Sequence, residues 1–253
     1  MSYGDTVVSS RGMGGVVPRQ SIYEESTTQN HALGDMLILT DGRKFRYCAN
    51  STAALTAHYM TSGPTVVANH TNMATALAAI GAKALVVTVG ATAVTANQYA
   101  NGYAWFNAGT GIGDIYKVKS HLANAGSLAM TVNLYDPLVL ATAAADTKTS
   151  LCKNPFKDVV VFPATTATNR PTGVPLIGIT ASTAALTYYF WAQTAGLCTV
   201  YCGATYTVGG AISVDDTAGF GLTIAGYPAF QWGVIVEIAA AAEKPNVVHL
   251  NID

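Results

Sequence analysis

The chain has 253 residues, of which 50% are hydrophobic and only 11% are charged, and its formal net charge is −1. Soluble domains average about 25% charged residues, yet no apolar run here approaches the roughly 18 residues of a membrane-spanning helix. The composition argues against membrane-spanning, wholly disordered and coiled-coil proteins, and without a basic excess we expect no nucleic-acid partner. So few charges of either sign fit a component covered by partners in an assembly, and equally an ordinary β domain with a Thr/Ser/Asn surface.

Charged residues are unevenly distributed along the chain. The first 50 residues contain ten of them, residues 47–113 contain only Lys83, and residues 171–214 contain none. This pattern indicates a polar N-terminal arm followed by charge-poor blocks.

Residues 1–30 are predicted to form this arm. They lack hydrophobic periodicity and contain four glycines within residues 4–15, followed by Pro18. An arm of this kind is either a disordered tail or a tether that becomes ordered on a neighbour. Because the start of the chain has no apolar stretch of the signal-peptide kind, we expect the protein to be used without Sec-type export.

A β-hairpin is predicted next, over residues 36–49. Two strand-type runs flank Asp41 and Gly42, a pair that favours the positive φ angles of a type I′ turn. The alanine-rich stretch 70–82 then favours a helix by propensity. Since it runs directly into the strand-type residues 84–89, helix and extended chain both remain open there.

Many short strand-type runs follow, separated by Gly, Pro and Asn turns. They cover residues 103–107, 115–120, 128–135, 138–141, 159–162, 176–180, 186–193, 198–201, 220–225, 232–239 and 247–252. This pattern is typical of a barrel or a sandwich. The expected fold is therefore mainly β, with two β-barrel or sandwich-like domains of short antiparallel strands after the extended N-terminal arm.

The domain boundaries follow from a Pro/Thr-rich segment in the second half of the chain. Residues 163–175 read as a linker or a long loop. We therefore expect an arm at 1–30, a β-rich domain at 31–162, the linker at 163–175 and a second β-rich domain at 176–253. Within the second domain, aromatic side chains fall on both faces of the strand at 186–193, which predicts burial on both sides.

Residues for catalysis or metal binding are sparse. The five histidines include no pair at i, i+4 spacing, and we expect each to be a surface or loop residue. The four cysteines (Cys48, Cys152, Cys198 and Cys202) form no CxxC motif, so small buried hydrophobes are the better interpretation of all four. We expect no enzymatic activity, no catalytic residues, no metal and no cofactor.

Two motifs bear a superficial resemblance to functional loops. The glycines at 109, 111 and 113 lack the spacing of a dinucleotide-binding loop and precede a strand, so a hairpin turn is the better interpretation. Asp215 and Asp216 provide two adjacent carboxylates that can bind a cation or act in sugar hydrolysis. A solvated turn is the favoured interpretation of this pair.

Five longer phrases carry a resemblance to a known family. They are ALGD (32–35) with DGRKFRY (41–47), VVTVGATAVTANQYANGY (86–103), YKVKSH (116–121), LYDP (134–137) and YFWAQ (189–193). Together they resemble structural proteins of tailed bacteriophages, especially aquatic phages such as cyanophages, of the head decoration or cement type. The resemblance covers most of the chain after Ile22 and includes no catalytic signature.

This resemblance implies a virion component on the outer surface of an icosahedral head, made in the host cytoplasm. Its partners are expected to be the major capsid protein and two further copies of itself in a homotrimer, with no nucleic acid and no membrane. Such a protein cements adjacent capsomers against internal DNA pressure. We expect Arg11, Arg19 and Tyr23 to tether the arm, and Tyr189 and Trp191 to form subunit contacts; the alternatives are a disordered tail and ordinary core residues.

Other classes stay open beside this expectation. A tail, spike or other minor virion component is one of them, although solenoid-type repeats are missing. The major capsid protein itself is disfavoured because no long amphipathic helix is visible. A host-glycan-binding module is a different class, in which an exposed Trp105, Trp191 or Trp232 stacks on sugars.

Overall fold

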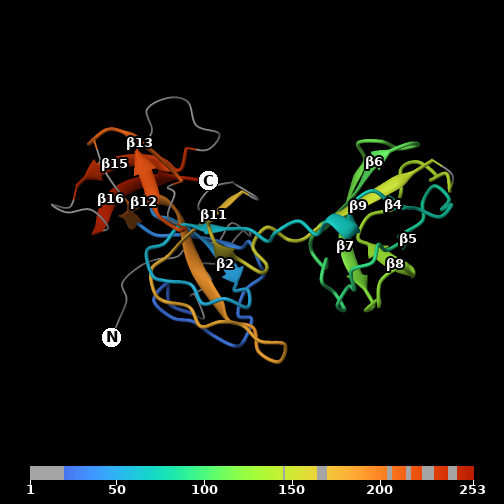
Figure 1. The fold of residues 1–253 in the computed structure, drawn as a ribbon, viewed down its shortest axis with the longest axis horizontal. Coiled ribbons are helices and arrows are strands. Elements are labelled where there is room, and N and C mark those ends of the chain that lie inside the picture. Colours follow the sequence, from blue (N-terminus) through green and yellow to red (C-terminus); the bar gives the residue numbers. More distant parts are fainter. Residues whose placement is uncertain are drawn as a thin grey trace. The chain divides into compact units, whose positions relative to one another are not determined.

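The computed structural model describes residues 20–144, 146–163, 170–203, 207–214, 218–223, 231–238 and 244–253. In these ranges the chain is almost entirely β, with one short 3₁₀ helix, η1 (Ala68–His70), and no α-helix. It divides into two compact units, each with its own sheet (Figure 1). The expected fold, two β-rich domains of short and mainly antiparallel strands, is confirmed.

The two units divide the chain at different positions from the expected ones. Unit 1 combines Met1–Pro64 with Pro155–Asp253, and unit 2 is Thr65–Asn154. Unit 2 is thus inserted between the two halves of unit 1, whereas the predicted domains follow one another along the chain. The reason is a long-range pairing, in which Ala49 lies opposite Tyr189, so the N-terminal hairpin belongs to the same sheet as the C-terminal strands.

Unit 1 contains a ten-stranded sheet. Its strands are β1 (Met36–Ile38), β2 (Lys44–Ala49), β3 (Thr61–Ser62), β10 (Val160–Val161), β11 (Pro171–Pro175), β12 (Tyr189–Cys202), β13 (Ala211–Val214), β14 (Gly221–Thr223), β15 (Gly233–Glu237) and β16 (Lys244–Asn251). Strand β12 is the longest and pairs with β2 and β11 along its first half and with β16 along its second. It joins two runs that the sequence presents as separate strands.

The first half of β12 is buried on both faces, as its aromatic pattern predicted. Phe190 packs in a cluster with Cys48 and Ile179, and Trp191 packs in another with Phe45 and Tyr47. These two clusters lie on opposite sides of the same strand, because successive side chains of a strand point to opposite faces. The strand therefore forms the centre of unit 1.

The predicted hairpin is present, with a different turn. Strands β1 and β2 pair in antiparallel fashion, but of the connecting residues only Gly42 has a positive φ, +86°. Its N–H donates to the carbonyl of Leu39 at 3.0 Å. A type I′ turn needs two such residues in a two-residue loop, whereas the loop closed by the bond from the N–H of Leu39 to the carbonyl of Arg43 has three residues and ends on a left-handed glycine.

The predicted linker contains a buried strand. All five residues of β11 are buried, and β11 pairs with both β3 and β12. Gly173 has a φ of +145°, and a Cβ there would lie 2.8 Å from the carbonyl oxygen of Gln193. The close approach of the two strands therefore requires a glycine at position 173 of the segment that reads as a linker. Residues 164–169 of the same segment lie outside the described ranges.

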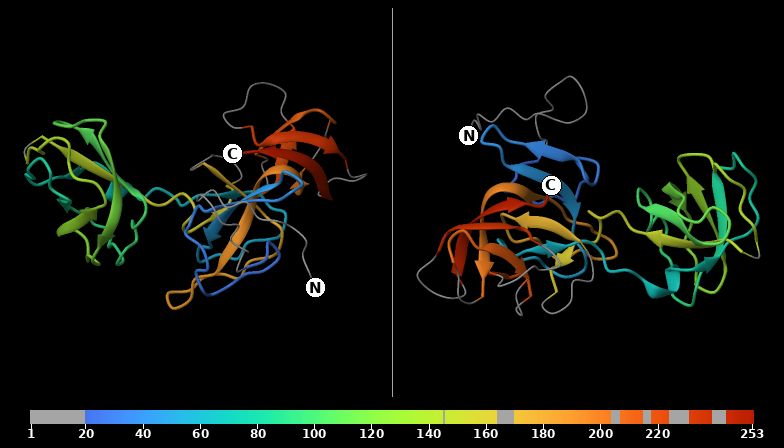
Figure 2. Two further views of the ribbon diagram at one scale, coloured as in Figure 1. Left: turned by 180° about the vertical axis from the view of Figure 1, so that it is seen from behind. Right: turned by 90° about the horizontal axis from the view of Figure 1, so that it is seen from above.

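Unit 2 contains a six-stranded sheet that curls toward closure (Figure 2). Its strands are β4 (Met73–Ala74), β5 (Ala84–Thr88), β6 (Tyr103–Ala108), β7 (Ile115–His121), β8 (Ala129–Leu134) and β9 (Lys148–Cys152). The order is β4-β9-β6-β7-β8-β5, and a bridge between Thr75 and Val87 joins the two ends. The glycine-rich segment 109–113 is the connection between β6 and β7, as predicted.

The helix alternative for residues 70–82 is wrong. Only η1 and the two-residue strand β4 form there, and the rest is an extended connection to β5. The N–H of Ala76 donates to the carbonyl of Val86 at 2.8 Å, and that of Thr142 donates to Ala78 at 2.9 Å. Bonds to other strands and loops thus take the backbone groups that a helix would pair internally, which is a tertiary override of local propensity.

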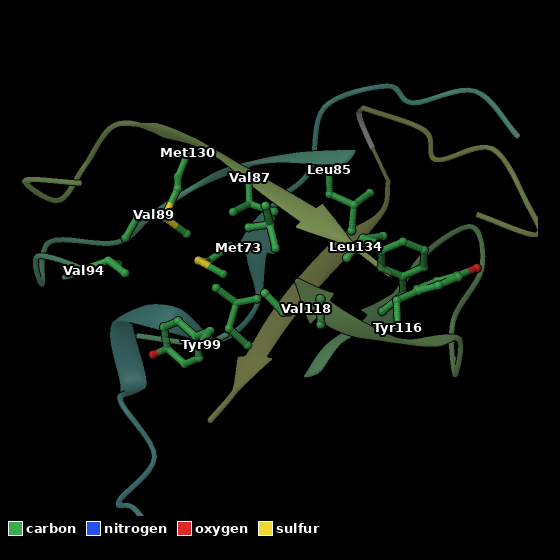
Figure 3. Packing of buried hydrophobic residues seen from close by; sticks show 14 of the residues in the cluster. Met73, Leu85, Val87, Val89, Val94, Tyr99, Tyr116, Val118, Met130 and Leu134 are labelled. Carbon is green, nitrogen blue, oxygen red and sulfur yellow. The ribbon is translucent and has the colours of Figure 1, made fainter. Parts of the chain in front are cut away.

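The interior of unit 2 is filled by apolar side chains from all six strands and their connections (Figure 3). Leu85, Val87, Val118 and Val132 are completely buried at its centre. They occupy alternate positions of their strands, so the intervening side chains point out of the barrel. The outward positions are therefore the ones available for contact with other molecules.

Candidate functional site

The arm residues of the predicted interface fall into two groups. Arg11 and Arg19 lie outside the described residues. Residues 20–30 are described and pack on unit 1 of the same chain. Gln20, which is buried, donates from Nε2 to the carbonyl of Tyr189 at 2.8 Å, and Ser26 forms a β-bridge with Tyr189. This part of the predicted arm is therefore a strap on its own domain, because β12 offers it unpaired backbone groups.

The aromatic strand of the predicted interface lies under that strap. Trp191 is only 3% exposed, and its indole N–H donates to the carbonyl of Gln20 at 3.2 Å. Tyr189 is half-buried and stacks on Tyr47, with ring centroids 6.1 Å apart. The side chain of Trp191 is thus a core residue of unit 1 and is closed to another subunit.

Tyr47 fixes the strap from inside. Its hydroxyl donates to Oε1 of Gln20 at 2.6 Å and accepts from the N–H of Asn30 at 3.1 Å. Burial raises the pKa of Tyr47 to about 12, so the phenol stays protonated and keeps its donor role at any physiological pH. The two sequence regions chosen as separate contact sites therefore contact each other within one chain.

Tyr23 is the exposed member of the predicted set, at 54%. Tyr23 lines a shallow pocket of about 250 Å³ in unit 1. The other lining residues are Arg43, His58, Leu176, Gln193, Leu197, Cys198, Thr199 and Val247. Burial alone lowers the pKa of Arg43, but hydrogen bonds to Asp41 and Tyr23 raise it above the ordinary value. The pocket wall therefore carries one permanent cation whose guanidinium is already paired with Asp41 at 2.6 Å.

Two polar side chains form the inner wall of this pocket. His58 has a φ of +65°, and its Nδ1 lies 2.9 Å from the hydroxyl of Thr199. Gln193 is completely buried and donates from Nε2 to the carbonyls of Ala195 and Leu197. Within the described residues its Oε1 has no hydrogen-bond partner. The pocket thus combines an imidazole–hydroxyl pair with a buried amide group.

Metal-binding clusters are not found in the described ranges: no group of three or more His, Cys, Asp or Glu side chains is close enough to hold an ion. Asp215 and Asp216 lie outside those ranges. No helix of the described chain has the length and apolarity of a bilayer crossing.

Three single residues, one cysteine and two histidines, differ from their expected burial. Cys152 is exposed, whereas the other three cysteines are buried as predicted. His70 and His121 are buried, not surface residues. They flank Tyr99, whose hydroxyl bonds to Nδ1 of His70 and whose backbone N–H donates to Nε2 of His121 at 3.0 Å. These histidines are structural parts of unit 2.

A group of exposed apolar side chains lies at one end of unit 2. The chain enters before β4 and leaves after β9 at one end of the barrel, and the connections β4–β5, β6–β7 and β8–β9 lie at the opposite end. These three connections present five large aliphatic side chains, each at least half exposed, which we call the apolar tip: Leu77, Ile80, Ile112, Val139 and Leu140. Hydrogen bonds between residues 76–82 and 138–142 hold two of the connections side by side.

The outer wall of unit 2 provides a second exposed group. Of the three tryptophans, Trp191 and Trp232 are buried and Trp105 is 41% exposed. Trp105 stands on β6 beside Tyr103, on the face opposite to the core. Of the sugar-stacking candidates, only Trp105 is placed for contact with a ligand.

Sequence reasoning missed the apolar tip and most of this outer wall. The signal for the wall was present, since the runs at 103–107 and 115–120 alternate between core and outward positions. The tip carries no such signal, because its residues lie in connections whose partners are set by tertiary folding. No family model, curated protein or solved structure matches the chain, so the following proposals rest on its own residues and on the resemblance described above.

Proposed function

We propose that this protein is a structural component of a phage particle, which binds the outer surface of the head and holds adjacent capsomers together. The observation that carries the proposal is the apolar tip of unit 2. Five large aliphatic side chains, each at least half exposed, lie on three connections at the same end of the barrel, and groups of exposed apolar side chains mark contacts with other macromolecules. The resemblance to decoration proteins supplies the identity of that partner, the major capsid protein.

The way in which the two units are built supports a mechanical role. Unit 1 closes its aromatic core with its own residues 20–30, so it is a self-contained block. Unit 2 exposes the aliphatic side chains of the apolar tip at the end of its barrel opposite to the points where the chain enters and leaves the unit. On a closed lattice many such contacts act together, and small energies per contact sum to a large resistance against internal pressure.

Sedimentation of the particles from the native source through a density gradient tests this proposal. We expect the chain to co-sediment with full heads at about one copy per major capsid subunit. A few copies per particle indicate a tail or vertex component instead. If the chain stays at the top of the gradient, the proposal of a virion component is wrong.

A pair of variants tests the role of the apolar tip in the same experiment. The double substitution Leu77→Ser and Ile80→Ser removes two of its five side chains and is expected to reduce head occupancy strongly. Leu122→Ser is the matched control, because Leu122 is 82% exposed in the β7–β8 connection at the opposite end of unit 2. Equal loss of occupancy in both variants contradicts a specific role of the tip.

A further inference from the structure

The outer wall of the unit 2 barrel carries an exposed group of aromatic, aliphatic and lysine side chains. We call it the aromatic–lysine face, and its members are Tyr103, Trp105, Ile115, Lys117 and Tyr135. It is distinct from the apolar tip, because most of its residues lie on strands, not in connections.

Strand register places these side chains next to one another. Tyr103 on β6 lies opposite Lys117 on β7, and Trp105 lies opposite Ile115. Directly opposed residues of antiparallel strands have Cα atoms about 4.5–5.5 Å apart, and residues two apart on one strand are separated by roughly 7 Å. The side chains of Tyr103, Trp105 and Lys117 are therefore neighbours on the same outer face of the sheet.

The position of that ammonium group is fixed by a second ring. Nζ of Lys117 lies 5.5 Å from the ring centroid of Tyr135, a cation–π contact. The hydroxyl of Tyr135 donates to Oδ1 of Asn101 at 3.1 Å, which holds the ring in place. Lys117 is thus oriented before any ligand arrives.

The strands of unit 2 carry charges of one sign, whereas its three aspartates lie in the connections, and one of them, Asp136, directly follows Tyr135. Strands β4 to β9 contain three lysines, Lys117, Lys119 and Lys148, and no acidic residue. Two of the three aspartates of unit 2 are held by polar groups of the connections: Asp114 accepts from the hydroxyl of Tyr116, and Asp146 accepts from Thr110. A complementary ligand is therefore anionic.

The same ligand must also offer apolar faces for Tyr103 and Trp105. Sugar rings do so, because their C–H groups pack against aromatic faces, and a uronic or sialic acid adds a carboxylate. A nucleic acid is disfavoured, since residues 65–154 contain no arginine and only five lysines against three aspartates. Nucleic-acid binders need a dense cationic surface along the phosphate backbone.

We propose that the aromatic–lysine face binds an acidic polysaccharide, in which Trp105 and Tyr103 stack on sugar rings and Lys117 pairs with a carboxylate. This binding does not depend on the head-assembly proposal, because it uses a different surface of unit 2 and a different ligand. The proposal for the apolar tip and the proposal for the aromatic–lysine face can therefore be disproved independently of each other.

The fluorescence of the intact chain provides a direct test. Trp105 is the exposed tryptophan and the other two are buried, so quenching by acrylamide reports mainly on Trp105. The probes are four acidic polymers, namely alginate, polygalacturonate, hyaluronan and polysialic acid, with neutral dextran and oligo(dT) for comparison. We expect at least one acidic polymer to protect Trp105 from quenching, with an affinity that falls as salt is added.

Matched variants then assign the contacts, with isothermal titration as the readout. Lys117→Gln is expected to weaken binding about tenfold, and Trp105→Ala at least as much. Lys83→Gln removes the same charge from an exposed position before β5 and is expected to change affinity less than twofold. Trp105→Phe keeps an aromatic face and is expected to retain most of the binding.

Four results overturn the proposal. No protection by any of the four acidic polymers excludes an acidic polysaccharide as the ligand. If neutral dextran binds as tightly as the acidic polymers, the negative charge of the ligand does not contribute to binding. Tighter binding of oligo(dT) than of the acidic polymers assigns the face to nucleic acid. Equal effects of Lys117→Gln and Lys83→Gln show that attraction is general to the surface and not specific to this face.

Discussion

The two units have the same type of secondary structure but differ in where they place their tryptophans. Unit 1 encloses Trp191 and Trp232 and covers its aromatic strand with residues 20–30, whereas unit 2 leaves Trp105, Tyr103 and the five aliphatic residues of the apolar tip in solvent. The units also differ in charge, with a formal net charge of −3 for unit 1 and +2 for unit 2. Both surfaces for which we propose contacts with other molecules therefore lie on unit 2.

The two units differ as well in how their chain segments are assembled. Unit 2 is one continuous segment with its own core, whereas unit 1 is completed only when segments from both ends of the chain pair. A contact surface on a continuous unit can change without disturbing the strand pairing of unit 1. This separation explains how one chain combines a closed core with exposed apolar surfaces.

The largest expected effect concerns the independence of unit 2. Because its hydrophobic core is complete within residues 65–154, we expect this segment alone to fold and to melt cooperatively. Thermal unfolding followed by circular dichroism checks this, and the intact chain is expected to show a matching transition. An isolated segment without cooperative melting contradicts the division into two units.

The next effect compares a buried tryptophan with an exposed one. Trp191→Ala removes a core side chain, so we expect unit 1 to lose about 3–5 kcal/mol of stability. Trp105→Ala is expected to change the stability of unit 2 by about 0.5 kcal/mol or less, since surface substitutions seldom do more. Urea unfolding measures both, and similar losses from the two variants would falsify the contrast.

A smaller effect concerns the buried hydrogen bonds around Tyr99. Nε2 of His70 lies 2.9 Å from the carbonyl of Thr92 and therefore carries the proton, so Nδ1 accepts from the Tyr99 hydroxyl. Tyr99→Phe leaves this buried acceptor unpaired and is expected to cost unit 2 about 1–3 kcal/mol. Tyr103→Phe removes an exposed hydroxyl and serves as the control, for which we expect no measurable loss in urea unfolding.

The smallest effect is a pH dependence of unit 1. Burial lowers the pKa of His58 below its ordinary value, against a weaker opposing hydrogen bond with Thr199. The unfolded chain therefore takes up the proton first, so stability is retained above the unfolded pKa and is lost as pH falls through about 6.5. We expect the Tm of unit 1 to fall by about 1–3 °C from pH 7.5 to 5.5, because His58 is only partly buried.

A variant separates His58 from the other histidines in that experiment. Asn is tolerated at the positive φ of residue 58 and has no charge to gain. His58→Asn is expected to flatten the pH dependence of the unit 1 transition measured by calorimetry. An unchanged slope assigns the effect to other groups.

Much of the fold was predictable from the sequence because alternation is a local signal. The runs around β5, β6, β7, β8 and β16 identify their strands directly. Strands β3, β4, β9, β11 and β13 were missed because they are short or rich in Pro, Thr and Gly, and long-range partners make them strands. The strands predicted at 138–141 and 176–180 do not form. The domain boundary was missed for the same reason, since composition does not report that Ala49 pairs with Tyr189.

The candidate contact residues were less predictable than the fold. Tyr23 was chosen as a tether and its side chain is exposed, whereas Trp191 was chosen as a subunit contact and is a core residue. An aromatic residue on a strand has the same local pattern in either case. Whether its ring faces solvent depends on what covers it, and residues 20–30 cover Trp191 from more than 150 positions away.

The insertion of unit 2 also sets the order in which a ribosome can complete the molecule. Ala49 and Tyr189 are partners although 140 positions of chain separate them. At a synthesis rate of about 5–20 residues per second, β2 waits on the order of ten seconds for β12 to be made. Unit 2 emerges complete during that interval, so it folds while the first half of unit 1 still lacks its partner strand. Vectorial synthesis thus favours completion of the inserted domain before unit 1.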